Sequence, residues 1–203
     1  MVKTLVCVDM SNLHYYLTKK GWRINWEKFK SHICRLYGDV VFIFYDGFMC
    51  RQHFMALNPG VSELQYYLSV KKKQSFFKYL KRMGYRVECK PTVQTCDIDT
   101  GELKRKCNFD VEITMDALTK INEYNRFVLC SADRDFLKLI KYLKNQHKET
   151  VLIYPKDRTS KEIIKCVNRR FTLGSMKYII GEVLPNKIGS TVADPDHLDF
   201  SRL

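Results

Sequence analysis

Short apolar runs alternate along this chain with longer stretches in which apolar residues recur every three or four positions. The runs are too short for buried helices, so they predict strands at residues 4–8, 40–45, 85–90, 127–130 and 150–154, the last of them the final parallel strand. The helical spacing predicts helices at residues 13–20, 26–36, 61–83, 110–124, 136–143, 160–167 and 173–184. This alternation is typical of a three-layer α/β fold with a central, mostly parallel sheet flanked by helices.

Breaker residues divide this pattern into one domain with two excursions. Residues 46–60 carry strong turn signals and are expected to form a loop, and the Asp-Thr-Gly turn at residues 99–101 predicts a hairpin over residues 91–108. Residues 1–184 are expected to form the domain, and residues 185–203 a C-terminal tail. In the helix at 61–83, the residues expected to face the core are Leu64, Leu68, Phe76, Phe77 and Leu80.

The eight cysteines are expected to be reduced thiols, because several lie inside predicted strands or helices as small buried hydrophobes do. Cys89, Cys96 and Cys107 come nearest to a metal cluster, but their gaps match none of the paired short spacings of zinc sites. No apolar segment approaches the roughly 20 residues of a membrane span, and the first apolar run is too short for a signal peptide. The sequence therefore predicts an unexported, cytoplasmic protein with no membrane segment.

The formal net charge of +13 favours a polyanionic partner, since neutralisation of phosphates releases counterions and dominates nucleic-acid affinity. Positive charge is densest in the helix at 61–83, where neighbouring tyrosines offer surfaces on which bases can stack. The residues expected to contact nucleic acid are Lys71, Lys72, Lys73, Lys104, Arg105, Lys106 and Arg134. A solvated basic surface without a partner is the alternative.

Carboxylates stand where strands give way to helices. Asp9 and Asp133 directly follow two predicted strands, and Asp110 begins the helix that leads to the second of them. Each is a suitable helix cap, yet the carboxyl ends of parallel strands share one edge of a sheet, where ligands bind. Several carboxylates brought together repel one another, and a divalent cation removes that conflict. Oxygen ligands without histidine or cysteine suit Mg²⁺ or Mn²⁺ rather than zinc.

Three segments together resemble the motifs of the NYN domain, of the LabA-like type within the PIN-like nucleases. They are Val8-Asp9-x-x-Asn12-Leu13, Lys106-x-x-x-Asp110-Val111 with Asp116-Ala117-Leu118, and Ser131-Ala132-Asp133-x-Asp135-Phe136. The resemblance covers about residues 1–180 and implies a PIN-like, Rossmann-like fold and a Mg²⁺-dependent ribonuclease that leaves 5′-phosphate and 3′-hydroxyl ends.

The resemblance also implies roles for individual residues. Asp9, Asp110 and Asp133 are expected to be catalytic and, together with Asp135, to bind the metal. The supporting residues are expected to be Asn12, Ser131, Asp135 and Asp116. The family pattern usually has glycine where this chain has Met10 and Ala132, and Met10 is expected either to crowd the mouth of the site or to alter the turn.

Other functions stay open. A non-catalytic RNA-binding or adaptor module would keep the same fold and basic surface, and a homo-oligomer is compatible with the sequence. Asp9-Met10-Ser11 also begins the Asp-x-Ser-x-Ser signature of von Willebrand adhesion sites, but Leu13 takes the place of the second serine. An aspartyl phosphatase would need Asp-x-Asp, and Ser11 stands where its second aspartate should be.

Overall fold

A six-stranded parallel sheet forms the centre of the protein. The computed structural model describes residues 3–96 and 103–183, without the side chains of residues 94–106. In sheet order the strands are β4 (Tyr85–Pro91), β3 (Val40–Phe48), β1 (Thr4–Asp9), β7 (Arg126–Cys130), β8 (Glu149–Tyr154) and β9 (Arg169–Thr172). Every neighbouring pair in this sheet is parallel, which confirms the expected α/β, PIN-like architecture.

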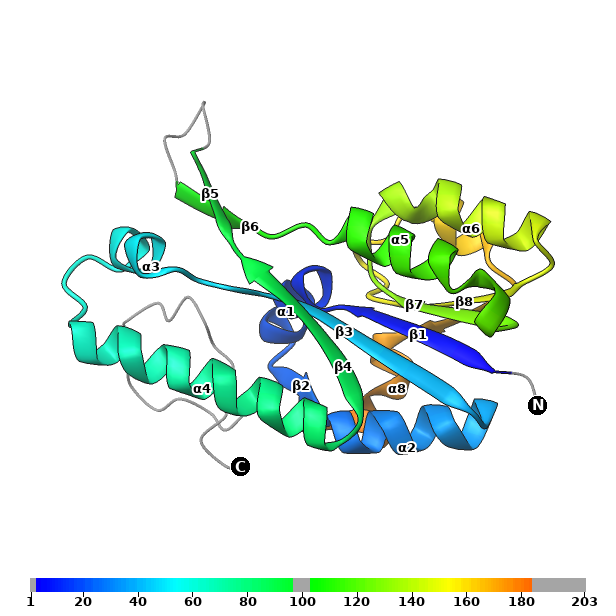
Figure 1. Cartoon of the computed structure of the whole chain (residues 1–203), viewed down its shortest axis with the longest axis horizontal. Coiled ribbons are helices and arrows are strands. Elements are labelled where there is room, and N and C mark those ends of the chain that lie inside the picture. Colours follow the sequence, from blue (N-terminus) through cyan, green and yellow to red (C-terminus); the bar gives the residue numbers. More distant parts are fainter. Residues whose placement is uncertain (1–2, 97–102, 184–203) are drawn as a thin grey trace.

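Helices cover both faces of the sheet, as Figure 1 shows. On one face the core is completed by α1 (Met10–Lys19), α2 (Trp26–Tyr37), α4 (Glu63–Arg82) and α8 (Leu173–Ile180). On the other face it is completed by α5 (Asp110–Thr119), α6 (Leu137–Asn145) and α7 (Lys161–Cys166). In the described part of the chain, no helix is both long enough and apolar enough to span a membrane.

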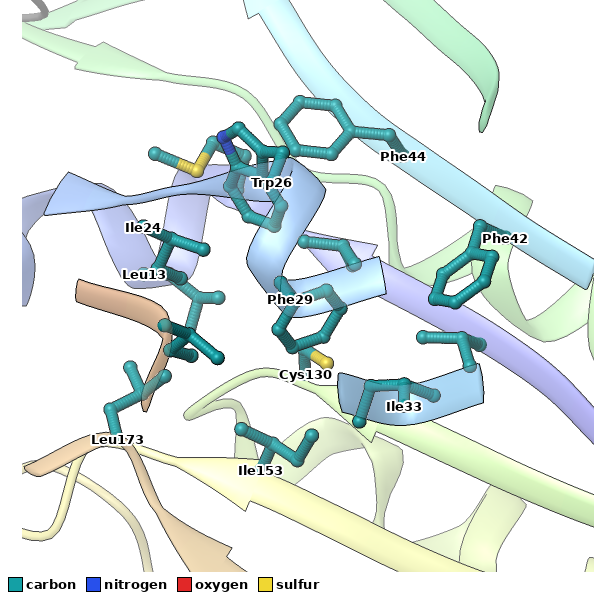
Figure 2. Packing of buried hydrophobic residues seen from close by; sticks show 14 of the residues in the cluster. Leu13, Ile24, Trp26, Phe29, Ile33, Phe42, Phe44, Cys130, Ile153 and Leu173 are labelled. Atoms are coloured by element: carbon teal, nitrogen blue, oxygen red, sulfur yellow. The ribbon is translucent and has the colours of Figure 1, made fainter. Parts of the chain in front are cut away.

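Two buried clusters hold these layers together, because alternate residues of a strand point to opposite faces. Phe42 and Phe44 of β3 enter the cluster beneath α2, whereas Ile43 and Tyr45 enter the cluster beneath α5. Figure 2 shows the first cluster, in which the Trp26 and Phe44 rings meet edge to face with 4.8 Å between their centroids. Strands that are buried on both faces explain the nearly continuous apolar runs in the sequence.

The order of the strands creates a crevice at the carboxyl ends of β1 and β7. The chain builds outward from β1 through β3 to β4 and then returns to place β7 on the other side of β1. Loops after two strands on either side of such a reversal diverge, and ligands of open α/β sheets bind in the opening that results. A ligand site is therefore expected among the residues that follow β1 and β7.

Several local expectations were wrong. Residues 46–60 are not all loop, because α3 (Arg51–Leu57) lies there, and residues 150–154 are not the final parallel strand, because β9 follows. Leu64 and Leu68 are exposed rather than inward, since only the second half of α4 packs on the sheet, through Phe76 and Leu80.

Short antiparallel pairs complete the described fold. The strands β2 (Trp22–Ile24) and β10 (Gly181–Val183) pair with each other, and neither was expected. At the position of the expected hairpin, β5 (Val93–Cys96) pairs with β6 (Leu103–Lys106). The tail expected at residues 185–203 lies outside the described residues, so the domain limits stay a prediction.

Candidate metal centre

Three carboxylates converge at the crevice beyond β7. Asp110, Asp133 and Asp135 each offer an oxygen, and these atoms all lie within 4.8 Å of one another. Asp110 and Asp133 are half-buried and Asp135 is exposed, so the cluster is open to solvent on one side. Among the described residues, these three acids form the one cluster of possible metal ligands.

Backbone geometry aims these side chains at one another. Ser131, which follows β7 and is buried, accepts a hydrogen bond from the Asp133 backbone amide at 3.1 Å through its hydroxyl oxygen. The Asp133 carboxylate in turn accepts from the Asp135 amide at 2.9 Å and caps the short 3₁₀ helix η2 (Arg134–Phe136). Asp110 begins α5, which packs against η2. The structure therefore confirms Asp133 as a cap and leaves it free to face the acid cluster, and its role in a metal site stays a prediction.

Asp9 lies behind this cluster and is fully buried. One of its carboxylate oxygens accepts from the Ser11 hydroxyl at 2.6 Å and the Asn12 amide at 3.4 Å. The other accepts from the Asn12 side chain at 2.6 Å and the Ser131 hydroxyl at 3.0 Å. Asp9 thus connects the turn after β1 to the turn after β7 through Ser131. Asp9 itself is not a member of the cluster of three acids.

The electrostatics of the site favour binding of a cation. Burial raises the pKa of Asp110, and the neighbouring carboxylates of Asp133, Asp9 and Asp135 raise it further. Burial also raises the pKa of Asp9, although its hydrogen bonds oppose the shift. A hard divalent cation takes carboxylate oxygens as ligands and would neutralise this repulsion, so the donor set fits Mg²⁺ or Mn²⁺.

Two residues that replace the usual glycines of the family pattern fit the turns without strain. Met10 is buried and packs in the core cluster beneath α1, so it does not crowd the mouth of the site. Among the described residues, His147 is the only non-glycine residue with a positive φ, so neither Met10 nor Ala132 occupies a conformation that requires glycine.

Asp116 lies away from the three acids, further along α5. It accepts a hydrogen bond from the Tyr45 hydroxyl at 2.8 Å and pairs with Lys120 and with Arg86. Burial opposes ionisation of Asp116, but Lys120, Tyr45 and Arg86 outweigh it and hold the pKa of this carboxyl below its ordinary value. These contacts anchor α5 to the sheet, so Asp116 supports the site only through the position of its helix.

The basic residues expected to bind nucleic acid divide into separate groups. Lys73 reaches from α4 to Asp46 at the end of β3, with 2.6 Å between Nζ and Oδ2. Lys71 lies over the Tyr67 ring at 5.0 Å, and Lys72 is exposed. Arg134 pairs with Glu162 at 3.0 Å. The side chains of Lys104, Arg105 and Lys106, on β6, lie outside the described residues.

Sequence reasoning missed Asp46 as part of this sheet edge. Asp46 is almost fully buried and follows the apolar run of β3, which is the same signal that identified Asp9 and Asp133. Lys90 of β4 also forms an ion pair with Glu112 of α5, two residues after Asp110. Only the β-sheet register shows that Asp46 and Lys90 share the edge with Asp9, because Asp9 pairs with Tyr45 on β3 and Lys90 pairs with Gly47.

Comparisons with known proteins agree with this arrangement. The model of the NYN domain matches residues 3–174 of the chain. The chain is 22% identical over 181 residues to the low amplitude and bright protein LabA of Synechococcus elongatus, covering 86% of each sequence. A crystal structure of a protein of unknown function from Vibrio parahaemolyticus covers 85% of this chain and 93% of its own, with a TM-score of 0.62 and 22% identity.

Proposed function

Because the chain belongs to the NYN domain family and is of the LabA-like type, we propose that it is a Mg²⁺- or Mn²⁺-dependent ribonuclease. The observation that carries this proposal is the convergence of Asp110, Asp133 and Asp135 within 4.8 Å at the crevice beside β7. Membership of the PIN-like nuclease superfamily supports the proposal, because an acidic cluster of this kind could bind a divalent metal as in PIN-like nucleases. The free thiols of the described cysteines suit a reducing compartment, so a cytoplasmic location belongs to the same proposal.

In this proposal the three acids hold the ion, which would activate water and stabilise charge on the scissile phosphate. Asp110 contributes from α5 and Asp133 from the turn after β7, so the two main ligands stand on separate elements of the fold. Asp135 is exposed and completes the set from the solvent side.

Asp9 acts in the proposal as a positioning residue. Its hydrogen bonds to Asn12 and Ser131 hold the floor of the site, and Ser131 in turn holds the amide of Asp133. A direct bond from Asp9 to the metal stays a prediction. The basic surface would recruit RNA through its phosphates, whether single-stranded or structured.

A non-catalytic RNA-binding module is the second candidate. The observation in its favour is that both oxygens of Asp9, the first acid of the family pattern, are engaged by Ser11, Asn12 and Ser131. Such a module would bind RNA with the same affinity whether or not a divalent cation is present, and it would leave the RNA intact.

Hydrolysis of labelled single-stranded RNA with Mg²⁺ or Mn²⁺ tests the proposal. We expect cleavage by the wild-type chain and its loss in Asp110→Asn and in Asp133→Asn. The matched control is Asp39→Asn, because Asp39 is exposed and its backbone carbonyl accepts from Thr4 at the opposite end of β1. Retention of full activity in both site variants would overturn the assignment, and RNA binding without any turnover would favour the second candidate.

A further inference from the structure

A groove of about 490 Å³ opens directly beside the acid cluster. It is lined by Asn12, Ala132, Asp133, Arg134, Asp157, Arg158, Thr159 and Ser160. Asp133 therefore belongs both to the groove and to the proposed metal centre. The volume lies within the range of about 300–1,000 Å³ that small-molecule ligands occupy. A molecule bound at the acids can thus continue into this groove.

Arg158, which lines the groove, contacts the ring of Tyr15 just outside the lining residues. Tyr15 lies on α1 three residues after Asn12, so the two side chains share a side of the helix. Tyr15 is 57% exposed, because the buried face of α1 is formed by other residues. The guanidinium of Arg158 stands over this ring with 4.3 Å between its central carbon and the ring centroid.

The charges around the groove leave Arg158 available to a ligand. Asp157 pairs with Lys20 at 3.1 Å, and Arg134 pairs with Glu162 at 3.0 Å. Among the described residues, no carboxylate forms an ion pair with Arg158. Arg158 therefore can offer its N–H donors to an external anion while its guanidinium stays in contact with the ring of Tyr15.

These features match the chemistry of a nucleotide. Bases of single-stranded nucleic acid stack on aromatic rings regardless of sequence, and an arginine beside the ring adds a cation for the phosphate. We propose that this groove holds the nucleotide that adjoins the scissile phosphate, with its base stacked on the face of the Tyr15 ring opposite Arg158 and its phosphate bound by Arg158. The inference rests on the ribonuclease function proposed above, and it makes single-stranded RNA the substrate class of the site.

Binding of RNA hexamers that carry 2-aminopurine at one position tests this inference in buffer with EDTA, where turnover is excluded. Stacking contributes about 1–3 kcal/mol per base, so Tyr15→Ala should weaken the RNA Kd about 5- to 150-fold and remove the quenching of the base. Tyr15→Phe keeps the ring and should bind within twofold of wild type. Arg158→Gln should weaken RNA binding and reduce the slope of log K against log salt concentration by about 1, as expected for the loss of one phosphate contact.

The control is Tyr178→Ala, which removes a 97% exposed tyrosine on α8 and should leave binding unchanged. In Mn²⁺, Tyr15→Ala should lower kcat/KM of cleavage, chiefly through a higher KM. Tyr15→Ala and Arg158→Gln proteins that bind RNA as wild type does would overturn the groove assignment, as would a wild-type chain that binds no RNA. Binding that depends on Tyr15 in a chain that never cleaves RNA would instead overturn only the ribonuclease proposal.

Discussion

Asp110→Asn should stabilise the metal-free protein while it abolishes the response to metal. The oxygens of Asp133 and Asp135 lie within 4.8 Å of an oxygen of Asp110. Two unit charges at that separation repel by about 0.9 kcal/mol in water and about 3.5 kcal/mol at an effective dielectric constant of 20. The exposure of the cluster favours the lower figure, so loss of one charge relieves about 2 kcal/mol from two pairs.

The position of Asp110 in the first turn of α5 offsets part of this gain. A carboxylate there interacts favourably with the helix dipole by about 0.3–1 kcal/mol, and the asparagine loses that contribution. The net expectation is a stabilisation of about 1 kcal/mol in EDTA, which corresponds to a rise in Tm of about 2–4 °C for a domain of this size.

Thermal unfolding with and without Mn²⁺ measures both effects. Wild type at a metal concentration about 100 times its Kd should gain about 2.7 kcal/mol, and Asp110→Asn should gain almost nothing. The control Asp39→Asn should respond as wild type does. An Asp110→Asn protein that is less stable than wild type in EDTA, or that keeps the full response to Mn²⁺, would refute the reasoning.

Three further predictions concern the scaffold. Asp116→Asn should remove about 1–3 kcal/mol of stability at neutral pH. Because the pKa of Asp116 is lowered in the folded state, this contribution is fully present above the ordinary value of about 3.9 and is lost progressively as the pH falls from there through the folded-state pKa. Urea unfolding should therefore show a smaller difference between variant and wild type at pH 3 than at pH 7. Gly47→Ala should lower stability by about 1–3 kcal/mol, because a Cβ there would lie 2.8 Å from the Cys107 sulfur. The control Gly174→Ala should not lower stability, because the nearest atom to its Cβ would be the Tyr16 hydroxyl at 3.5 Å. Asn25→Ala should cost about 0.5–2 kcal/mol by removing the N-cap of α2, in which Asn25 accepts from the Lys28 amide at 2.9 Å, and an unchanged Tm would count against that role.

Periodicity predicted the sheet and its large helices because each of them buries a long apolar face. The runs at β1, β3, β7 and β8 are continuous since helices cover both sides of those strands. Short elements such as β2, α3 and β10 were missed because three to seven residues carry too few positions to show a period. Leu64 and Leu68 follow the helical period but lie on the exposed half of α4, and burial of that half depends on tertiary contacts.

The candidate site could be predicted as a set of acids but not as a geometry. Asp133 and Asp110 were identified because carboxylates stand at the junctions of strands and helices. The sequence could not show that Ser131 donates to Asp9, since that bond joins turns 122 residues apart. The bonds that Asp9 accepts from Ser11 and Asn12 are local, within three residues. The sequence also could not show that Asp116 lies apart from the cluster. One of the partners that fix its carboxylate is the hydroxyl of Tyr45, 71 residues away in the chain.

The position of a bound metal tests the central claim most directly. Crystals of the full chain soaked in Mn²⁺ should show an anomalous density peak bonded to oxygens of Asp110, Asp133 and Asp135, at about 2.0–2.2 Å as expected for a small hard cation. The matching crystal of Asp110→Asn should lack the peak. A peak on other residues, or none at these three carboxylates in wild-type crystals at millimolar Mn²⁺, would contradict the account.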